Sequence, residues 1–436
     1  MLQSLVAALQ LPDLRKRILF VLGMFAIFEL GLHIPVPGIN PQAMERLFDP
    51  AKGGMALGFL DIFSGGALRK YTIFAMGITP YINASIIMQL LTVAIPQLEQ
   101  LAKEGGESGR KQISQYTRYL TAGLAFLQAI GMNIMLTRGG ILQASIGEFF
   151  LIVLTLTAGT AFLMWIGDQV TEKGIGNGVS LIIFASIMAR LPAGLSEIWA
   201  YYREGAIAWT QVALLALLWL ATVVGVVAIT QATRRIPIQH AKRLVGNKQY
   251  GGTSSYLPFK VNSAGVIPII FAMSLLMIPM TLASFVSRDS FFGGFMQGAA
   301  QIFSPGSPGI KGVVGSLLEA GLIIFFTYFY TAVMVNVPDI ADNLKKWGSF
   351  IPGIRPGKPT LEYLDRVMTR ITLAGAIFLA LIALLQYWIP AITGIHSTNF
   401  GLYGGTSLLI VVGVALETMQ TMEAHLMMRT YEGFIK

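Results

Sequence analysis

The chain is a hydrophobic, basic polypeptide of 436 residues, of which 54% are hydrophobic and only 12% are charged. Its formal net charge is +9, and its mean hydropathy is +0.65. This composition excludes a soluble globular protein and indicates a membrane protein with several spans. The sequence has no cysteine, which excludes disulfides and thiolate metal sites, and its four histidines show no metal-ligand spacing.

The N-terminus shows no cleavable signal peptide. Residues 2–11 form a short amphipathic stretch, followed by Pro12 and the basic cluster Arg15, Lys16 and Arg17. The apolar run after this cluster has full spanning length, so we expect it to remain as the first membrane span, with residues 1–17 in the cytosol.

The chain contains enough apolar segments for about ten membrane spans, each close to the roughly 20 residues that a bilayer requires. We therefore predict an all-α multi-pass membrane protein. The predicted spans are 18–36, 73–95, 117–137, 148–168, 179–199, 209–231, 261–287, 313–337, 371–393 and 402–424. Five spans on each side of a midpoint near residue 200 suggest two inverted halves, 18–200 and 201–424.

Lys and Arg are divided unevenly between the two sets of loops. The loops on the side of the N-terminus carry 22 of them, and the loops on the opposite side carry 8. Because basic residues accumulate in cytosolic loops, we expect both termini, including the tail 425–436, to lie in the cytosol.

A short apolar segment lies between the first two predicted spans. Residues 53–66 read GGMALGFLDIFSGG, which is bounded by glycine pairs and is too short to cross a membrane. Such a segment either lies at the membrane surface or folds into the interior, where protein or a water-filled cavity surrounds it. The residues leave both alternatives open.

Two long basic loops lie on the predicted cytosolic side, at 232–260 and 338–370. The general enrichment of Lys and Arg in cytosolic loops explains why these two loops are basic. It does not explain why they are long, since most connections are far shorter. Long basic loops suit docking of a polyanion, such as ribosomal RNA, or of an acidic protein surface. The candidate docking residues of the first loop are Arg234, Arg235, Lys242, Arg243 and Lys248.

Chemistry-bearing motifs are absent from the sequence. The glycine-rich run at 174–178 is GxGxG rather than GxGxxG and follows no Rossmann strand, and no catalytic pair of an intramembrane enzyme stands out. Among charges within spans, Glu29, Glu148, Glu319 and Glu417 are expected near span ends, whereas Arg190 is the deepest and could line a wet vestibule. Few midplane charges weaken the alternative of an inverted-repeat secondary transporter.

Polar residues and isoleucines recur within the spans. Polar side chains in a span either join helices or line a water path. Isoleucines near mid-span either pack or face lipid, or they form a narrow apolar constriction that resists wetting. The polar candidates are Asn83, Gln128, Asn262 and Ser274, and the isoleucines are Ile78, Ile82, Ile183, Ile270 and Ile410.

Short motifs distributed over nearly the whole chain resemble the SecY/SEC61-alpha family, the central channel subunits of the Sec protein translocase. The motifs are IPVPG (34–38), FSGG (63–66), GITPYI (77–82), SQYTRY (114–119), GIGNG (174–178), NSAGVIP (262–268), ADNLKK (341–346), FIPGIRPG (350–357) and GTSLLI (405–410). The resemblance implies ten helices in two five-helix halves that open like a clamshell around a pore.

The resemblance also assigns site residues. A half-helix plug falls at 55–65, and the five isoleucines fall on the pore ring. A lateral gate lies between the second and third spans on one side and the seventh and eighth on the other, where the four polar candidates are placed. Arg355 and Lys358 join the docking residues. The predicted plug side chains are Leu57, Phe59, Leu60, Ile62, Phe63, Ser64 and Gly65.

The implied function is passage of unfolded preproteins across the bacterial plasma (inner) membrane and sideways release of transmembrane segments into the lipid bilayer. The implied partners are the small subunits SecE and SecG, the SecA ATPase, the ribosome with its RNA and exit-tunnel proteins, and signal peptides and nascent chains. No cofactor and no catalytic residue is expected. Two departures from the family pattern are Asn247-Lys248, where paired arginines are common, and Glu29, where an arginine is expected.

Overall fold

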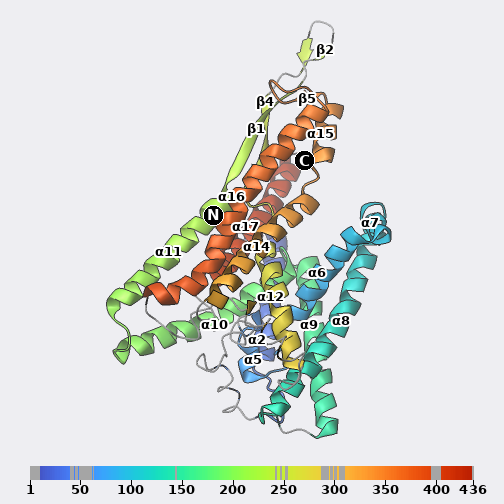
Figure 1. The fold of residues 1–436 in the computed structure, drawn as a ribbon. Helices are drawn as coiled ribbons and strands as arrows, with labels where there is room; N and C mark the ends of the chain where they lie inside the picture. Colours follow the sequence, from blue (N-terminus) through green and yellow to red (C-terminus); the bar gives the residue numbers. More distant parts are fainter. Residues whose placement is uncertain are drawn as a thin grey trace.

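The computed structural model describes most of the chain and shows a mainly helical protein (Figure 1). The described residues are 10–39, 44, 48, 61, 63–142, 145–240, 243–245, 248–250, 254–285, 294, 298, 302–303, 310–393 and 404–434. The helices are α2 (Pro12–Gly31), α5 (Ala67–Lys70), α6 (Thr79–Ala94), α7 (Pro96–Lys103), α8 (Gly106–Arg138), α9 (Ile146–Lys173), α10 (Gly178–Arg203), α11 (Trp209–Gln231), α12 (Ile267–Phe285), α14 (Ile310–Met334), α15 (Val337–Lys346), α16 (Lys358–Thr393) and α17 (Gly405–Phe434).

Each predicted span overlaps one long helix, but the helices differ in how well they suit a membrane. In the described part of the chain, seven helices are long and apolar enough to cross a bilayer, and the bent pair α6 and α7 adds an eighth if it counts as one span. The helix α2 is not among them because Asp13, three basic residues and Glu29 fall within its 20 residues. The protein is therefore a multi-pass membrane protein.

The predicted span 73–95 is wrong at its start. The helix α6 begins only at Thr79, since Gly77 adopts a left-handed conformation (φ 57°) and Pro80 fits the first turn of a helix but not its interior. At the other end Ile95 is extended before Pro96, and α7 departs from α6 at an angle of 100°.

The residues before α6 form a compact non-spanning segment, 63–78, which we call the collar. It contains the single turn of α5, and Tyr71 holds the left-handed conformation (φ 46°) at its end. Backbone hydrogen bonds from Ile73 to Ile34 and from Val36 to Tyr71 tie the collar to the chain after α2. These bonds satisfy polar backbone groups that lipid could not.

The collar packs closely against the helices that surround it. A Cβ atom at Gly159 of α9 would lie 2.0 Å from the carbonyl oxygen of Ile73, and one at Gly31 of α2 would lie 1.9 Å from the ring of Phe74. The Tyr71 hydroxyl donates a hydrogen bond to Oδ1 of Asn133 on α8, and both residues are fully buried. Glycines on α2 and α9 thus make room for the collar.

The long helices pack in two groups joined through α12. One group contains α6, α8, α9 and α10, and the other contains α11, α14, α16 and α17, while α12 packs against α6 and α8 on one side and α14 on the other. In Figure 1 the blue α6 and the cyan α8 lie on one side of the yellow α12, and the orange-to-red α16 and α17 lie on the other. The helices α10 and α17 also contact each other.

The two long basic loops are joined into one sheet. Its strands are β1 (Thr233–His240), β4 (Ser254–Lys260) and β5 (Ser349–Phe350), in the order β4-β1-β5, and a separate hairpin pairs β2 (Arg243–Val245) with β3 (Lys248–Tyr250). On β1 the alternating Ile236 and Ile238 are buried against α15 and α16. The sheet extends beyond the helices at the end of the molecule that carries α15 (Figure 1).

Candidate functional site

The five predicted ring isoleucines lie in one buried apolar cluster. Their exposed fractions run from 1% to 7%, and they come from α6 and its N-cap, α10, α12 and α17: Ile78, Ile82, Ile183, Ile270 and Ile410. Phe63 and Phe74 of the collar belong to the same cluster. Five β-branched apolar side chains from four helices therefore belong to one large buried cluster, to which both helix groups and the collar contribute.

The predicted plug is only partly within the described residues. Leu57, Phe59, Leu60 and Ile62 lie outside them. Phe63 and Ser64 are buried, and Gly65 and Gly66 adopt left-handed conformations (φ 68° and 87°). A Cβ atom at Gly65 would lie 3.2 Å from the Cα of Ser186 on α10, so this glycine pair forms a tight turn against α10.

The predicted gate residues come from α6, α8, α12 and the segment before α12, and α12 packs against α6 and α8. Asn83 on α6, Asn262 just before α12 and Ser274 on α12 are buried, and Gln128 on α8 is half-buried. The Nδ2 of Asn262 donates to the carbonyl of Gly265 at 3.0 Å. The amide oxygens of Asn83 and Asn262 have no hydrogen-bond partner among the described residues, and a buried polar atom left unpaired weakens the contact that buries it.

The predicted docking residues cluster on the sheet and the turn beside it. Arg234 and Arg235 are exposed on β1, Arg355 is exposed between β5 and α16, and Lys358 is exposed as the first residue of α16. The Oγ1 of Thr360 donates to the carbonyl of Arg355 at 2.8 Å and fixes that turn. Lys242 lies outside the described residues, and Arg243 and Lys248 are described only as strand residues of β2 and β3.

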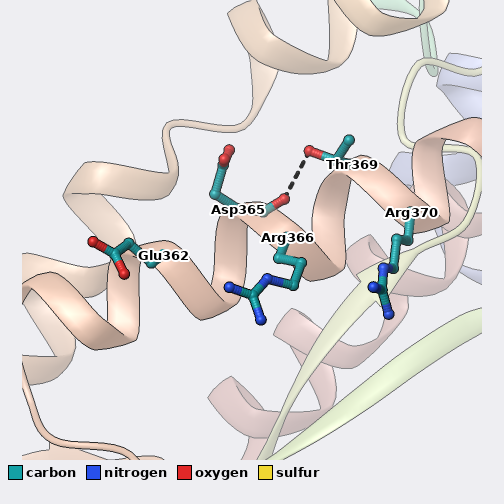
Figure 2. Close-up of a pocket in the computed structure, with 5 residues that line it drawn as sticks. All are labelled: Glu362, Asp365, Arg366, Thr369 and Arg370. Atoms are coloured by element: carbon teal, nitrogen blue, oxygen red, sulfur yellow. Dashed lines mark hydrogen bonds between the residues drawn. The ribbon is translucent and has the colours of Figure 1, made fainter.

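A shallow charged groove runs along the first turns of α16. Figure 2 shows that its residues share one helix face, with Glu362 and Asp365 toward the start and Arg366 and Arg370 further along. The Oγ1 of Thr369 donates to the backbone carbonyl of Asp365 at 2.9 Å, as Figure 2 marks. Acids and arginines at helical spacing are common on an exposed helix face, and these five residues include no nucleophile with an adjacent base.

Two predictions about charged residues are wrong. Arg190 does not line a wet vestibule, because its guanidinium pairs with the Asp61 carboxylate at 2.5 Å and its side chain is only 11% exposed. Glu319 is fully buried, and since α14 already starts at Ile310, it lies more than two turns inside that helix.

The unexpected Glu29 lies in a small charged group at the end of α2. Its carboxylate is 3.9 Å from the Nδ1 of His33, one turn later, and the Nζ of Lys70 lies 3.4 Å from the Nε2 of His33. All three side chains are exposed. Lys70 of the collar thus supplies basic charge beside α2 where the family pattern has an arginine.

Across the described residues, no group of three His, Cys, Asp or Glu could hold a metal ion.

Comparisons with known proteins agree with this arrangement. The SecY family model matches residues 72–419. The protein translocase subunit SecY of Streptomyces scabiei is 46% identical over 452 residues, which covers 100% of both chains. The solved structure described as "The structure of a protein conducting channel" has a TM-score of 0.67 at 18% identity and covers 94% of this chain and 92% of its own. Sec61 in the canine ribosome-channel complex from the endoplasmic reticulum has a TM-score of 0.64 at 16% identity, with the same coverage.

The multi-pass helical fold is shared with solved protein-conducting channels. The chain belongs to the SecY family, and it is a protein-conducting channel subunit of a protein translocase. The secondary-transporter alternative is not favoured.

Proposed function

We propose that the chain spans the bacterial plasma membrane with ten helices in two inverted five-helix halves, and that both termini lie in the cytosol. The halves would comprise 18–200 and 201–424, between the cytosolic segments 1–17 and 425–436. The overlap of every predicted span with a long helix supports the count, and the excess of Lys and Arg in the loops on one side supports the orientation.

One structural observation supports the proposed pore ring. Ile78, Ile82, Ile183, Ile270 and Ile410 converge in one buried cluster although they come from distant parts of the sequence. An apolar waist of this kind does not bind a passing polypeptide, and it resists wetting when closed. The predicted plug at 55–65 would add to this seal, and the burial of Phe63 in the same cluster supports its position.

The seam between α12 and the pair α6 and α8 is proposed as the lateral gate. A transmembrane segment of the passenger must leave sideways into lipid, which needs two helix groups that can separate. The unpaired amide oxygens of Asn83 and Asn262 make closure of this seam less favourable than a fully apolar contact would be. We infer that the gate is closed tightly enough to exclude lipid yet is easily opened by an apolar signal peptide.

The β4-β1-β5 sheet and the turn that holds Arg355 are proposed as the cytosolic docking surface. Exposed Arg234, Arg235, Arg355 and Lys358 suit ribosomal RNA or the acidic surface of a motor such as SecA. SecE and SecG would be the small membrane partners, and nascent chains with their signal peptides the cargo. The chain itself would need no cofactor, since the ribosome or the SecA ATPase supplies the energy.

Reconstitution tests this function. The chain, co-purified with its SecE and SecG companions, is placed in liposomes with SecA, ATP and a preprotein that carries a signal sequence. We expect the preprotein to become protected from external protease only when ATP and the signal sequence are both present. Protection that persists without the signal sequence, or none with a complex shown to be intact, would contradict the proposal.

A further inference from the structure

A buried ion pair joins Asp61, two residues before the collar, to Arg190 of α10. Asp61 has a side-chain exposure of 1%, and its carboxylate meets the guanidinium of Arg190 at 2.5 Å. Both residues belong to the first half of the chain, 18–200, but they are far apart in the sequence. Charges are rare inside a membrane protein because burying them is costly unless they are paired.

Asp61 also organises the collar itself. Its Oδ1 accepts a hydrogen bond from the backbone N–H of Arg69 at 2.9 Å, and its backbone carbonyl accepts one from Gly66 at 3.0 Å. The Ser64 hydroxyl donates to that carbonyl at 3.1 Å and accepts from the backbone N–H of Leu68. One carboxylate therefore closes the turn at 61–69 and at the same time binds α10.

The stem of Arg190 packs on the glycine turn of the same segment. A Cβ atom at Gly66 would lie 3.6 Å from the Cδ of Arg190, and Gly65 approaches the backbone of Ser186 one turn earlier on α10. The same helix carries Ile183 of the isoleucine cluster. Arg190 thus sits where the position of the collar is set relative to the apolar waist.

We propose that Asp61 and Arg190 are a positioning pair, which fixes the point at which the predicted plug joins the rest of the channel. This inference rests on the proposed plug and pore ring. With the pair intact, Asp61, two residues before the collar, is held against α10, which anchors the predicted plug there. With one partner neutralised, the other loses its opposite charge inside the protein and the anchor is released.

The test measures resting ion conductance of the reconstituted complex in planar bilayers, without preprotein. We expect Asp61→Asn and Arg190→Gln each to raise the resting conductance about tenfold, since loss of one partner of a buried pair is strongly unfavourable to the closed state. The double variant leaves two neutral amides, so we expect its conductance to fall back to within about threefold of the wild type. Arg190→Lys keeps the charge and should stay within the same range.

Arg118→Gln is the matched control. It makes the same substitution in the ion pair between Arg118 of α8 and Asp168 of α9 (2.8 Å), whose side chains are 48% and 29% exposed. We expect wild-type conductance. Wild-type conductance in both Asp61→Asn and Arg190→Gln, or additive effects in the double variant, would overturn the positioning role. If one single variant does not fold, the other single variant and Arg190→Lys still decide the question.

Preprotein translocation by the wild-type complex keeps the two proposals separate. Failure of the wild type to translocate a signal-bearing preprotein contradicts the proposed function. Active translocation by the wild type, together with unchanged conductance in the single variants, contradicts only the role of the ion pair.

Discussion

The backbone of Gln239 on β1 pairs with that of Phe350 on β5, and the next pair in register is His240 with Ser349. The Oγ of Ser349 also lies 2.8 Å from the Nδ1 of His240. Two basic loops that are far apart in the sequence therefore form one surface. A partner that binds this surface meets residues from both loops at once.

Charge reversal at Arg355 should weaken docking without harming the fold, because Arg355 is exposed on the turn beside β5. We expect Arg355→Glu to reduce SecA-driven translocation about tenfold or more, and to steepen the loss of SecA binding with added salt. Binding of labelled SecA to proteoliposomes, measured at several salt concentrations, checks this.

Arg138→Glu is the control for that experiment. Arg138 is an exposed arginine at the far end of α8, on the predicted opposite side of the membrane. Its reversal should leave SecA binding unchanged. Equal losses for both variants, or a drop in membrane insertion of the Arg355 variant itself, would indicate misfolding rather than docking.

A polar group in the isoleucine cluster should make the resting channel leak. Ile82 is 5% exposed, and Ile82→Asn places an amide that can hold water in the apolar waist. We expect a several-fold rise in resting conductance in planar bilayers. Ile82→Leu keeps volume and polarity and should behave as the wild type. Wild-type resting conductance in Ile82→Asn would argue against the proposed pore ring.

Cysteines at Asn83 and Ser274 should report on the seam. Both residues are buried on helices that pack together, and the chain has no cysteine of its own, so an introduced pair gives an unambiguous signal. We expect oxidation to join α6 and α12 in the idle complex and to block sideways release of a transmembrane segment. If both thiols react with a small maleimide in detergent but never cross-link, the gate assignment fails.

Loss of the Tyr71 hydroxyl should destabilise the collar. Tyr71→Phe removes the donor to the buried Asn133 Oδ1, and since the Nδ2 of that amide already has no partner among the described residues, the whole side chain is left unsatisfied. We expect a loss of about 1–3 kcal/mol in the free energy of unfolding. Thermal unfolding in detergent measures this, and the double variant Tyr71→Phe with Asn133→Leu should recover part of the loss.

The helices could be predicted from the sequence because long apolar runs leave a bilayer-spanning chain few other structures. The isoleucine ring was assigned by resemblance and stays a prediction, while the structure buries its five members within one large apolar cluster. The collar was missed because Tyr71 to Ile78 is as apolar as a span, and its fold depends on the left-handed Gly77 and on close contacts with Gly31 and Gly159. Apolar periodicity does not encode such contacts.

The pair between Asp61 and Arg190 was also missed, although a signal for it exists. Asp61 is an acid in an otherwise apolar half-length segment, and Arg190 is the deepest charge in a predicted span. Opposite charges that each lie in apolar surroundings are expected to pair, because neither can stay buried alone. Their positions along two helices of unknown packing gave no distance, so only the structure could join them.

The isoleucine cluster has a mechanical consequence. Four helices each supply one or two of its side chains, and they belong to both helix groups and to α12 between them. In the proposed pore ring, no single helix would set the width of the opening. If the helix groups move apart by a small amount, all four helices would withdraw their ring side chains together and would still present apolar tips, so that one opening could fit closely around passengers of different width.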